Sequence, residues 1–419
     1  MLRISVEKNV VIQAILDIPS SKSISNRALI IQALCTEKNA LENLSISDDT
    51  KVLKSALEQI KNKNSTQALT INIGLAGTAF RFLTAFLATQ NGKFILTGAK
   101  RIQERPIKPL VEALQKLGAD ISYLNNEGFA PLLIKGKKLK AKTLEIDADI
   151  SSQFITALLL ISPSLNQDFV LKLNNKISSK PYIDMTLSLM KNFGINSSFI
   201  KNNITISKGN YVSNTLFIEA DWSSASYFYE CLALANEGEI ILKNYSKKSI
   251  QGDSKLAELF IPFGVETVFE ENTVRLVKKK LNISFFEYDF SNEPDLAQTF
   301  IALCCGLNIK GTFSGLETLK IKETNRISAM NNEIQKIGFE LIETEKKGIY
   351  TLQKTGNKVG KEIVFKTYKD HRMAMSLAPL ALKFENISIE NPEVVSKSNP
   401  LFWEQMESLG FNLITKNTF

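Results

Sequence analysis

The stretch Ser20-Ser21-Lys22-Ser23-Ile24-Ser25-Asn26-Arg27, followed by an apolar run to Leu34, predicts a helix that begins among hydroxyl and cationic side chains. Ser is a common helix cap, but Lys and Arg near a helix start face the positive end of the helix dipole. Positive charge gathered there is favourable when an anion such as a phosphate binds the backbone N–H groups. This segment alone supports an anion site and a capped surface helix about equally.

Similar helix starts, rich in Ser, Thr, Asp or His and followed by apolar residues, recur along the chain. Their intervals are 55 residues for the first and 71–76 residues for the others. The starts are Ser23, Thr78, Ser152, Ser223, Asp295 and His371. Six helix N-termini aimed at one place would make a cleft that attracts anions.

A second predicted helix follows each start, and five of these second helices end in a Gly followed by alternating apolar and polar residues. Gly just beyond a helix is a common stop signal, and the alternation predicts a strand. β-branched stretches such as Glu239–Leu242 and Asn386–Ile389 predict strands between the helices. The glycines are Gly118, Gly194, Gly264, Gly338 and Gly410. The sequence therefore predicts six repeated units, the first of them short and without the Gly.

The length of 419 residues suits two bodies of three units each. We expect residues 1–18 and 220–419 to form one discontinuous domain, and residues 19–219 to form a domain inserted into it. The net charge of +8 favours anionic partners, either nucleic acid or small phosphorylated acids. The basic runs 136–142 and 278–280 lack aromatic residues and are interpreted as solvated loops, which argues only weakly for nucleic acid.

Other features point to a cytoplasmic protein. Cys35, Cys231, Cys304 and Cys305 lie in apolar helical segments without metal-ligand spacing, which predicts buried, reduced thiols. Residues 1–19 contain charges and predict a pair of strands instead of a signal peptide. Apolar runs are too short to span a membrane. We expect a monomer that binds small anions and has no nucleic-acid or membrane partner.

Three further charged clusters precede predicted helices. They are residues 103–106, residues 320–326 and residues 370–375, and the last contains the single histidine of the chain, His371. A lone His is usually structural and a lone Arg is usually solvated or paired, so each cluster taken alone has an ordinary structural explanation.

Together, seven motifs resemble the 3-phosphoshikimate 1-carboxyvinyltransferase (EPSP synthase) family of enolpyruvyl transferases, in family order over essentially the whole chain. The motifs are Pro19–Leu29, Ala76–Ala79, Glu104–Ile107, Ser151–Phe154, Ser179–Asp184, Lys322–Thr324 and Asp370–Met375. The resemblance implies an α/β fold, a two-domain inside-out barrel of six βαβαββ units with the active site in the interdomain cleft.

The resemblance also implies a reaction. The enolpyruvyl group of phosphoenolpyruvate passes to the 5-hydroxyl of 3-phosphoshikimate, and phosphate is released by addition and elimination through a tetrahedral intermediate. The family uses neither a metal nor an organic cofactor. One His, scattered Cys and the lack of a GxxxxGK[ST] or GxGxxG motif agree with that.

Residue roles follow on the matching positions. The resemblance implies that Asp295 handles the 5-hydroxyl proton, and that Glu323 and Lys22 protonate and deprotonate the methylene carbon; Asp295 also has an explanation as a helix cap. The implied 3-phosphoshikimate contacts are Lys22, Ser23, Arg27, Ser151, Ser152, Gln153, Ser179, Tyr182, Asp295, Thr318 and Lys322. The implied phosphoenolpyruvate contacts are Lys22, Gly77, Arg105, Gln153, Arg326, Arg372 and Lys397. If Lys22 is a surface lysine, Lys22→Ala should abolish turnover and leave stability nearly unchanged.

The chain departs from the family pattern at four positions. Leu75 and Thr318 stand where many members have Asn, Asn325 stands for an Asp, and Ser20 stands where Gly is common. None of these changes removes a charged catalytic group. Gly77 lacks a side chain, as in members of the family that bind the herbicide glyphosate in the phosphoenolpyruvate pocket, so the resemblance implies inhibition by glyphosate.

Three other kinds of protein share some of these features. The sister enolpyruvyl transferase that acts on UDP-N-acetylglucosamine shares the repeat but uses a loop cysteine, and this chain has none between Cys35 and Cys231. The RNA 3′-phosphate cyclase architecture contains fewer copies of the unit and would use a nucleotide. A basic, non-enzymatic nucleic-acid binder would show salt-sensitive binding without substrate dependence.

Overall fold

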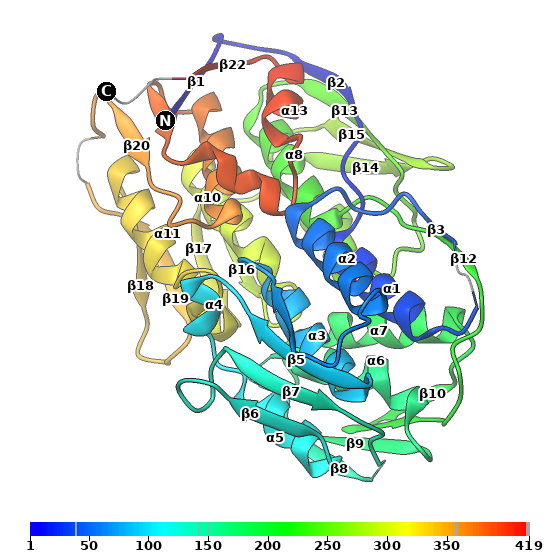
Figure 1. Ribbon diagram of the computed structural model, residues 1–419. Coiled ribbons are helices and arrows are strands. Elements are labelled where there is room, and N and C mark those ends of the chain that lie inside the picture. Colours follow the sequence, from blue (N-terminus) through cyan, green and yellow to red (C-terminus); the bar gives the residue numbers. More distant parts are fainter. Residues whose placement is uncertain (38–39, 141, 150, 357–358, 416–419) are drawn as a thin grey trace. The chain divides into compact units, whose positions relative to one another are not determined.

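The computed structural model describes residues 1–37, 40–140, 142–149, 151–356 and 359–415 (Figure 1). The chain packs as two compact units. Unit 1 comprises residues 1–20 and 219–419, and unit 2 comprises residues 21–218. Ser20 and Ala220, where the chain leaves unit 1 and returns to it, form an antiparallel β-bridge.

Unit 2 alternates helices with short strands. Its helices are α1 (Lys22–Leu34), α2 (Asp48–Lys61), α3 (Gly77–Thr89), α4 (Lys100–Gln103), α5 (Lys108–Lys116), α6 (Ser152–Ile161) and α7 (Lys180–Asn192), with the 3-10 turn η1 (Ser162–Ser164). Its strands are β3 (Ala40–Glu42), β4 (Leu69–Asn72), β5 (Gly92–Thr97), β6 (Asp120–Tyr123), β7 (Leu132–Gly136), β8 (Leu144–Asp147), β9 (Phe169–Asn174), β10 (Ser197–Ile200), β11 (Asn203–Ile206) and β12 (Thr215–Phe217).

Unit 1 contains the helices α8 (Trp222–Leu234), α9 (Leu256–Leu259), α10 (Ala297–Leu307), α11 (Arg326–Ile334), α12 (His371–Leu377) and α13 (Phe402–Ser408). Its 3-10 turns are η2 (Gly252–Lys255), η3 (Pro294–Leu296), η4 (Glu317–Ile321), η5 (Gln335–Ile337), η6 (Ala378–Leu382) and η7 (Pro392–Lys397). Its strands are β1 (Leu2–Val6), β2 (Ile12–Leu16), β13 (Gly238–Lys243), β14 (Val265–Phe269), β15 (Thr273–Lys278), β16 (Phe285–Asp289), β17 (Lys310–Ser314), β18 (Phe339–Glu343), β19 (Tyr350–Lys354), β20 (Ile363–Phe365), β21 (Ile387–Ile389) and β22 (Phe411–Thr415).

Across the described ranges, the strands form five four-stranded sheets of one topology and a sixth, smaller sheet. Their orders are β4-β5-β7-β6, β10-β11-β9-β8, β14-β15-β13-β2, β16-β17-β19-β18 and β20-β21-β1-β22. Each has one parallel pair, such as β4 with β5, and two antiparallel pairs. The sixth sheet is the parallel pair β12-β3, which confirms the predicted short first copy.

The predicted signals of the repeat are confirmed one by one. Helices or helical turns begin at or within two residues of all six predicted starts. The five glycines that follow the second helices have backbone φ angles between 76° and 96°, a left-handed conformation that costs Gly little. The N-terminal strands also form. They do not pair with each other, because β1 joins β21 and β22, whereas β2 joins β13.

Within each unit the first helices of the repeats pack on one another and the sheets cover them from outside. In unit 2 these are α1, α3 and α6, and in unit 1 they are α8, α10 and α12 (Figure 1). The α8 residues from Ser224 to Leu234 are all buried, as are the α10 residues from Ala297 to Cys305. This apolar surround explains why α8 and α10 lack a polar face. The arrangement is the expected inside-out architecture.

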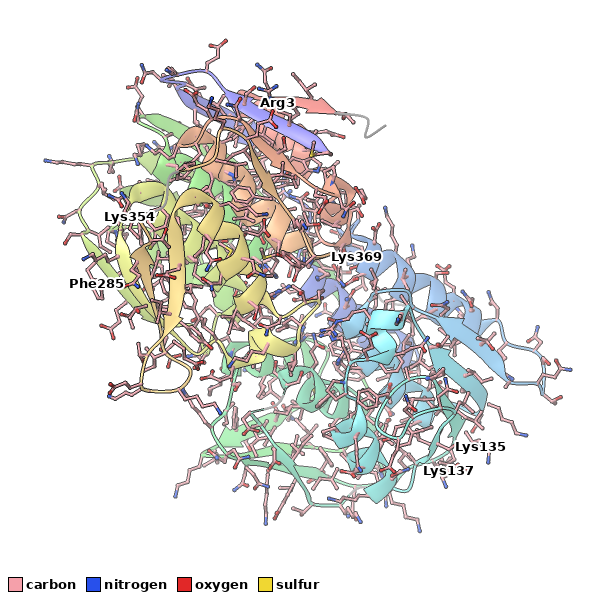
Figure 2. All side chains as sticks on the ribbon, turned by 90° about the vertical axis from the view of Figure 1, so that its left-hand side faces the viewer. Arg3, Lys135, Lys137, Phe285, Lys354 and Lys369 are labelled. Atoms are coloured by element: carbon pink, nitrogen blue, oxygen red, sulfur yellow. The ribbon has the colours of Figure 1, made fainter. Side chains whose placement is uncertain are left out.

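Two predictions about single residues need correction. Cys231, Cys304 and Cys305 are buried, but Cys35 ends α1 and is partly exposed. Lys278 does not lie in a solvated loop, since it ends β15, is half-buried and donates a hydrogen bond to the Ala233 carbonyl. In contrast, Lys137 is exposed and lies close to Lys135 of β7, at the lower right of Figure 2. Among the residues described, no helix is long and apolar enough to cross a membrane.

Candidate active site

The predicted site residues fall into two sets, one in each unit. In unit 2, Ser21 caps α1 by accepting a hydrogen bond from the Ile24 N–H at 3.3 Å. Lys22 is the first residue of α1, and its Nζ lies 3.5 Å from Oδ2 of Asp49. The two side chains are only 14% and 6% exposed. The interpretation of Lys22 as a solvated surface lysine is therefore wrong, and so is the basis for expecting Lys22→Ala to leave stability unchanged.

The side chain of Arg27 is buried among neutral oxygen atoms. Its Nε donates to Thr186 Oγ1 at 2.8 Å, and its Nη1 and Nη2 donate to the backbone carbonyls of Ser23 and Tyr182 at 2.9 and 3.2 Å. Burial lowers the pKa of Arg27 to about 10, so the side chain stays charged at neutral pH. A buried cation with neutral partners is stabilised by an anionic ligand. The alternative of a capped surface helix therefore does not describe Arg27, which is buried.

The starts of α3, α6 and α7 supply mainly neutral polar groups. Ser151 accepts from the Gln153 N–H at 3.3 Å, and Gln153 Nε2 donates to Thr78 Oγ1 at 3.1 Å, which joins two helix starts. The Oε1 atom of Gln153 is buried without a hydrogen-bond partner among the described residues. Ser179 precedes α7 with a left-handed φ of 57°, and Ser152 is the first residue of α6. These groups suit a ligand rich in hydroxyls.

Two guanidinium groups crowd against Gly77, the first residue of α3. A Cβ atom at Gly77 would lie 2.5 Å from Arg105 Nη1 and 2.9 Å from Arg81 Nη1. Both arginines are buried, and Arg81 Nη1 donates to the Gly77 carbonyl at 2.8 Å. Sequence reasoning missed Arg81. The available signal was a cation inside the apolar run Phe80-Arg81-Phe82, four residues after Gly77, where a helical side chain reaches back toward the helix start.

In unit 1, three carboxylates and three cations form one connected network. Arg326, whose side chain is 2% exposed, bonds Asp370 through Nε at 2.7 Å and Nη2 at 3.2 Å. It also bonds Asp295 through Nη1 and Glu323 through Nη2, both at 3.1 Å. Burial alone would lower the pKa of Arg326, but the charges of Asp370, Glu323 and Asp295 together raise it.

Arg372 and Lys397 complete the network. Arg372 Nη2 donates to Asp295 Oδ2 at 2.7 Å, and Arg372 Nη1 donates to the Tyr227 hydroxyl at 3.2 Å. Lys397 Nζ lies 3.2 Å from Glu323 Oε1. The charges of the six groups balance, so an anion that binds the cations must compete with the carboxylates.

Of the remaining residues singled out in the sequence, Thr318, Lys322, Asn325 and His371 belong to unit 1 and Leu75 belongs to unit 2. Thr318 lies in η4, and its Oγ1 is buried without a hydrogen-bond partner among the described residues. Lys322 is half-buried just after that turn, whereas Leu75 is exposed before α3. Asn325 caps α11 by accepting from the Ser328 N–H at 3.3 Å, so an amide serves the capping role at this helix start. His371 is buried, as expected of a structural histidine, with Nδ1 3.5 Å from Asp370.

The described residues contain no group of three or more His, Cys, Asp or Glu side chains arranged to hold a metal ion. Within each unit, the helix starts do bring polar and charged side chains together. Unit 2 offers cations beside hydroxyl and amide groups, and unit 1 offers carboxylates bound to cations. These are the groups needed to bind anions and to move protons.

Comparison with known proteins identifies the family. Residues 6–406 match the family described as EPSP synthase (3-phosphoshikimate 1-carboxyvinyltransferase). A 3-phosphoshikimate 1-carboxyvinyltransferase of Bacteroides fragilis is 43% identical over 405 residues, covering 96% of each chain. One of Aliivibrio salmonicida is 37% identical over 419 residues, covering 94% of this chain and 96% of the relative. The solved EPSP synthase of Acinetobacter baumannii has the same fold, with a TM-score of 0.77 at 19% identity, covering 99% of this chain and 100% of that one. The chain belongs to the EPSP synthase (3-phosphoshikimate 1-carboxyvinyltransferase) family.

Proposed function

We propose that this chain, a transferase of the shikimate pathway, uses the two residue sets described above to transfer the enolpyruvyl group of phosphoenolpyruvate to the 5-hydroxyl of 3-phosphoshikimate, releasing phosphate. The observation that carries the proposal is the position of Asp295, a carboxylate in contact with the buried cations Arg326 and Arg372. Joining an alcohol to an anionic enol phosphate requires a base that takes the hydroxyl proton and cations that bind the anion, and Asp295 with the two arginines offers both. The alternative acceptor UDP-N-acetylglucosamine is not favoured by the family match.

We propose that unit 2 supplies most of the 3-phosphoshikimate site. The start of α1, with Lys22, Ser23 and Arg27, suits the phosphate because backbone N–H groups and two cations converge there. The hydroxyl-bearing ring requires neutral donors and acceptors. We assign these to Ser151, Ser152, Gln153, Ser179, Tyr182 and Thr318, and we assign a further, cationic contact to Lys322. Support comes from Gln153 Oε1 and Thr318 Oγ1, which are buried and find no hydrogen-bond partner in the described part of the chain, and which a ligand hydroxyl would satisfy.

For phosphoenolpyruvate we propose a clamp of cations from both sets. Gly77 and Arg105 contribute from unit 2, together with Arg81, because both guanidinium groups approach the same backbone position. Arg326, Arg372 and Lys397 contribute from unit 1. Each charge-assisted hydrogen bond is worth about 1.5–3 kcal/mol. The bound anion would exchange places with the carboxylates that now hold Arg372 and Lys397.

The proposed chemistry assigns each proton to an atom. In the addition, Asp295 accepts the proton of the 5-hydroxyl, whose oxygen bonds to C2 of phosphoenolpyruvate while the methylene carbon takes a proton from Lys22. In the elimination, the resulting methyl group loses a proton to Glu323 and the C2–O bond to phosphate breaks. This order is supported by the contacts of Glu323 with Arg326 and Lys397, which favour its ionised form as a base.

The test is phosphate release with phosphoenolpyruvate and either acceptor. We expect release with 3-phosphoshikimate and none with UDP-N-acetylglucosamine. Well-folded protein that releases phosphate only with the second acceptor, or with neither, would overturn the proposal.

We also propose that units 1 and 2 are the two domains expected from the sequence, and that the protein is a cytoplasmic monomer. Light scattering after size exclusion should then give a mass near 46.8 kDa with and without substrates. A dimer mass would overturn the monomer.

A further inference from the structure

A buried carboxyl group that the proposed chemistry does not use lies beside the unit 1 network. Asp253 belongs to η2 and is 3% exposed. Its Oδ2 accepts a hydrogen bond from the hydroxyl of Ser223, and its Oδ1 is buried without a hydrogen-bond partner in the described part of the chain. Ser223 stands at the start of α8, the same place in the repeat as Ser23 in α1 and Ser152 in α6. A half-satisfied buried carboxyl next to a reaction site calls for a functional explanation.

The groups that face Asp253 carry both signs of charge. Asp221, which caps α8 by accepting from the Ser224 N–H at 3.2 Å, and Asp295 repel its ionised form, whereas Arg372 attracts it. Ser223, which donates to Asp253, and Tyr227, which accepts from Arg372, lie four residues apart on α8 and therefore on one face of that helix. The side chains of Lys255, in η2, and Glu258 pair with each other and are exposed.

Burial, and then the charge of Asp295, raise the pKa of Asp253 to about 7, against the opposing effects of the Ser223 hydrogen bond and Arg372. Asp253 is therefore neutral in weakly acidic solution and ionised in weakly alkaline solution. When Asp253 is neutral, the negative charge of Asp295 still acts on Arg372, to which Asp295 is hydrogen-bonded. The ionised form of Asp253 adds a second negative charge that acts on the same guanidinium.

We propose that Asp253 is a positioning residue for phosphoenolpyruvate binding, because its ionised side chain draws Arg372 away from the anionic substrate and its neutral side chain releases it. The inference rests on the proposed function, in which Arg372 holds phosphoenolpyruvate. Asp253 acts through Arg372 and does not touch the reacting atoms. Asp295, which is bonded to Arg372, and Asp253, which interacts with it through charge, thus set how much of the Arg372 charge is available to the substrate.

The experiment compares KM for phosphoenolpyruvate and kcat from pH 5.5 to 9 in the full-length wild type and in Asp253→Asn. The amide imitates the neutral acid and can still accept from Ser223. We expect the ratio of wild-type to variant KM to rise from about 1 below pH 6 to about 10 above pH 8, while the ratio of kcat changes less than twofold. The ratio is the measured quantity because the substrate phosphate itself titrates near pH 6.

Two further variants sharpen the result. Ser223→Ala removes the hydrogen bond that favours ionised Asp253, so the rise in KM should shift to higher pH. It also keeps the inference testable if Asp253→Asn does not fold. Glu230→Gln is the matched control, since Glu230 is another buried carboxyl of α8, and its KM profile should follow that of the wild type.

A ratio of wild-type to Asp253→Asn KM that stays constant across this pH range would overturn the inference. A rise of the same size in the ratio of wild-type to Glu230→Gln KM would overturn it too. A wild type without turnover would contradict the proposed function and not this inference. In that case calorimetric titration with phosphoenolpyruvate decides. The ratio of dissociation constants between wild type and Asp253→Asn should be near 1 at pH 6 and near 10 at pH 8.5, and equal ratios at the two pH values would contradict the inference.

Discussion

Arg372 donates a hydrogen bond of 2.7 Å from Nη2 to Oδ2 of Asp295, so a cation proposed to hold phosphoenolpyruvate is already bonded to the carboxylate proposed to act as the base. Substrate binding and base release are therefore coupled. When the anion takes Arg372, Asp295 loses a partner that stabilises its ionised form and becomes a stronger base. The arrangement favours activation of the 5-hydroxyl only after phosphoenolpyruvate has bound.

The first prediction concerns Asp295→Asn. Removing the base should lower kcat about 10²–10⁴-fold. The same change removes a carboxylate that competes for Arg372, so KM for phosphoenolpyruvate should fall instead of rise. Steady-state kinetics over both substrates measures the two effects, with Asp289→Asn, on the solvent-exposed end of β16, as the control. A kcat within tenfold of the wild type would remove Asp295 from the catalytic role.

The second prediction concerns Lys22. Lys22→Ala should abolish turnover and also lower stability by about 1–3 kcal/mol, because the buried Asp49 loses a cation 3.5 Å away. The double variant Lys22→Ala with Asp49→Asn should recover much of the stability and none of the activity. Thermal melts and the phosphate assay separate the two roles. Full activity of the double variant would contradict the role of Lys22 in both substrate sites.

The third prediction concerns Gly77. Gly77→Ala should raise KM for phosphoenolpyruvate, because its Cβ would lie 2.5 Å from Arg105 Nη1 and 2.9 Å from Arg81 Nη1 and must push both groups aside. Inhibition by glyphosate, which we expect in the same pocket, should weaken in parallel. Inhibition curves at low phosphoenolpyruvate measure this. Gly209→Ala, at a site without left-handed backbone where the nearest atom to a Cβ is Ile195 Cδ1 at 3.4 Å, tests the effect of a Gly change alone. Unchanged KM and inhibition in Gly77→Ala would contradict the crowding argument.

The fourth prediction concerns Glu230, whose two carboxyl oxygens are buried and have no hydrogen-bond partner among the described residues. Burial raises its pKa well above the ordinary value of 4.5 in the folded chain. Above pH 4.5 the unfolded chain releases the proton and the folded chain keeps it, so this group lowers stability by about 1.4 kcal/mol per pH unit until the folded pKa is reached.

The variant Glu230→Gln removes this dependence. Its melting temperature should exceed that of the wild type by an amount that grows from pH 5 to pH 8, with little difference near pH 5. Thermal melts across this range provide the measurement. A constant difference between the two proteins at every pH would show that Glu230 does not hold a proton in the folded state.

Much of the architecture followed from local signals in the sequence. The ends of five helices could be predicted because a left-handed residue after a helix strongly favours Gly. These glycines are Gly118, Gly194, Gly264, Gly338 and Gly410. The strands that pair with β1 and β2 could not be predicted from local sequence, because this pairing depends on contacts with strands hundreds of residues away, such as β21 and β13.

The residues of the candidate site could be predicted where a sequence motif contains them, but their burial and their pairing could not. Asp295, Arg326 and Arg372 stood out as charges at helix starts, but their mutual pairing depends on tertiary packing. Arg81 was missed because a cation within an apolar helix resembles a solvated side chain until burial is known. The buried state of Lys22 was misjudged for the same reason.

The central claim is tested most directly by phosphorus NMR of a mixture of the protein, phosphoenolpyruvate and 3-phosphoshikimate. The account predicts that the phosphoenolpyruvate signal is replaced one for one by inorganic phosphate, while the shikimate phosphate is retained in an enolpyruvyl ether, and that omission of 3-phosphoshikimate stops the change. Unchanged phosphoenolpyruvate in the presence of folded protein, or phosphate formed without 3-phosphoshikimate, would contradict it.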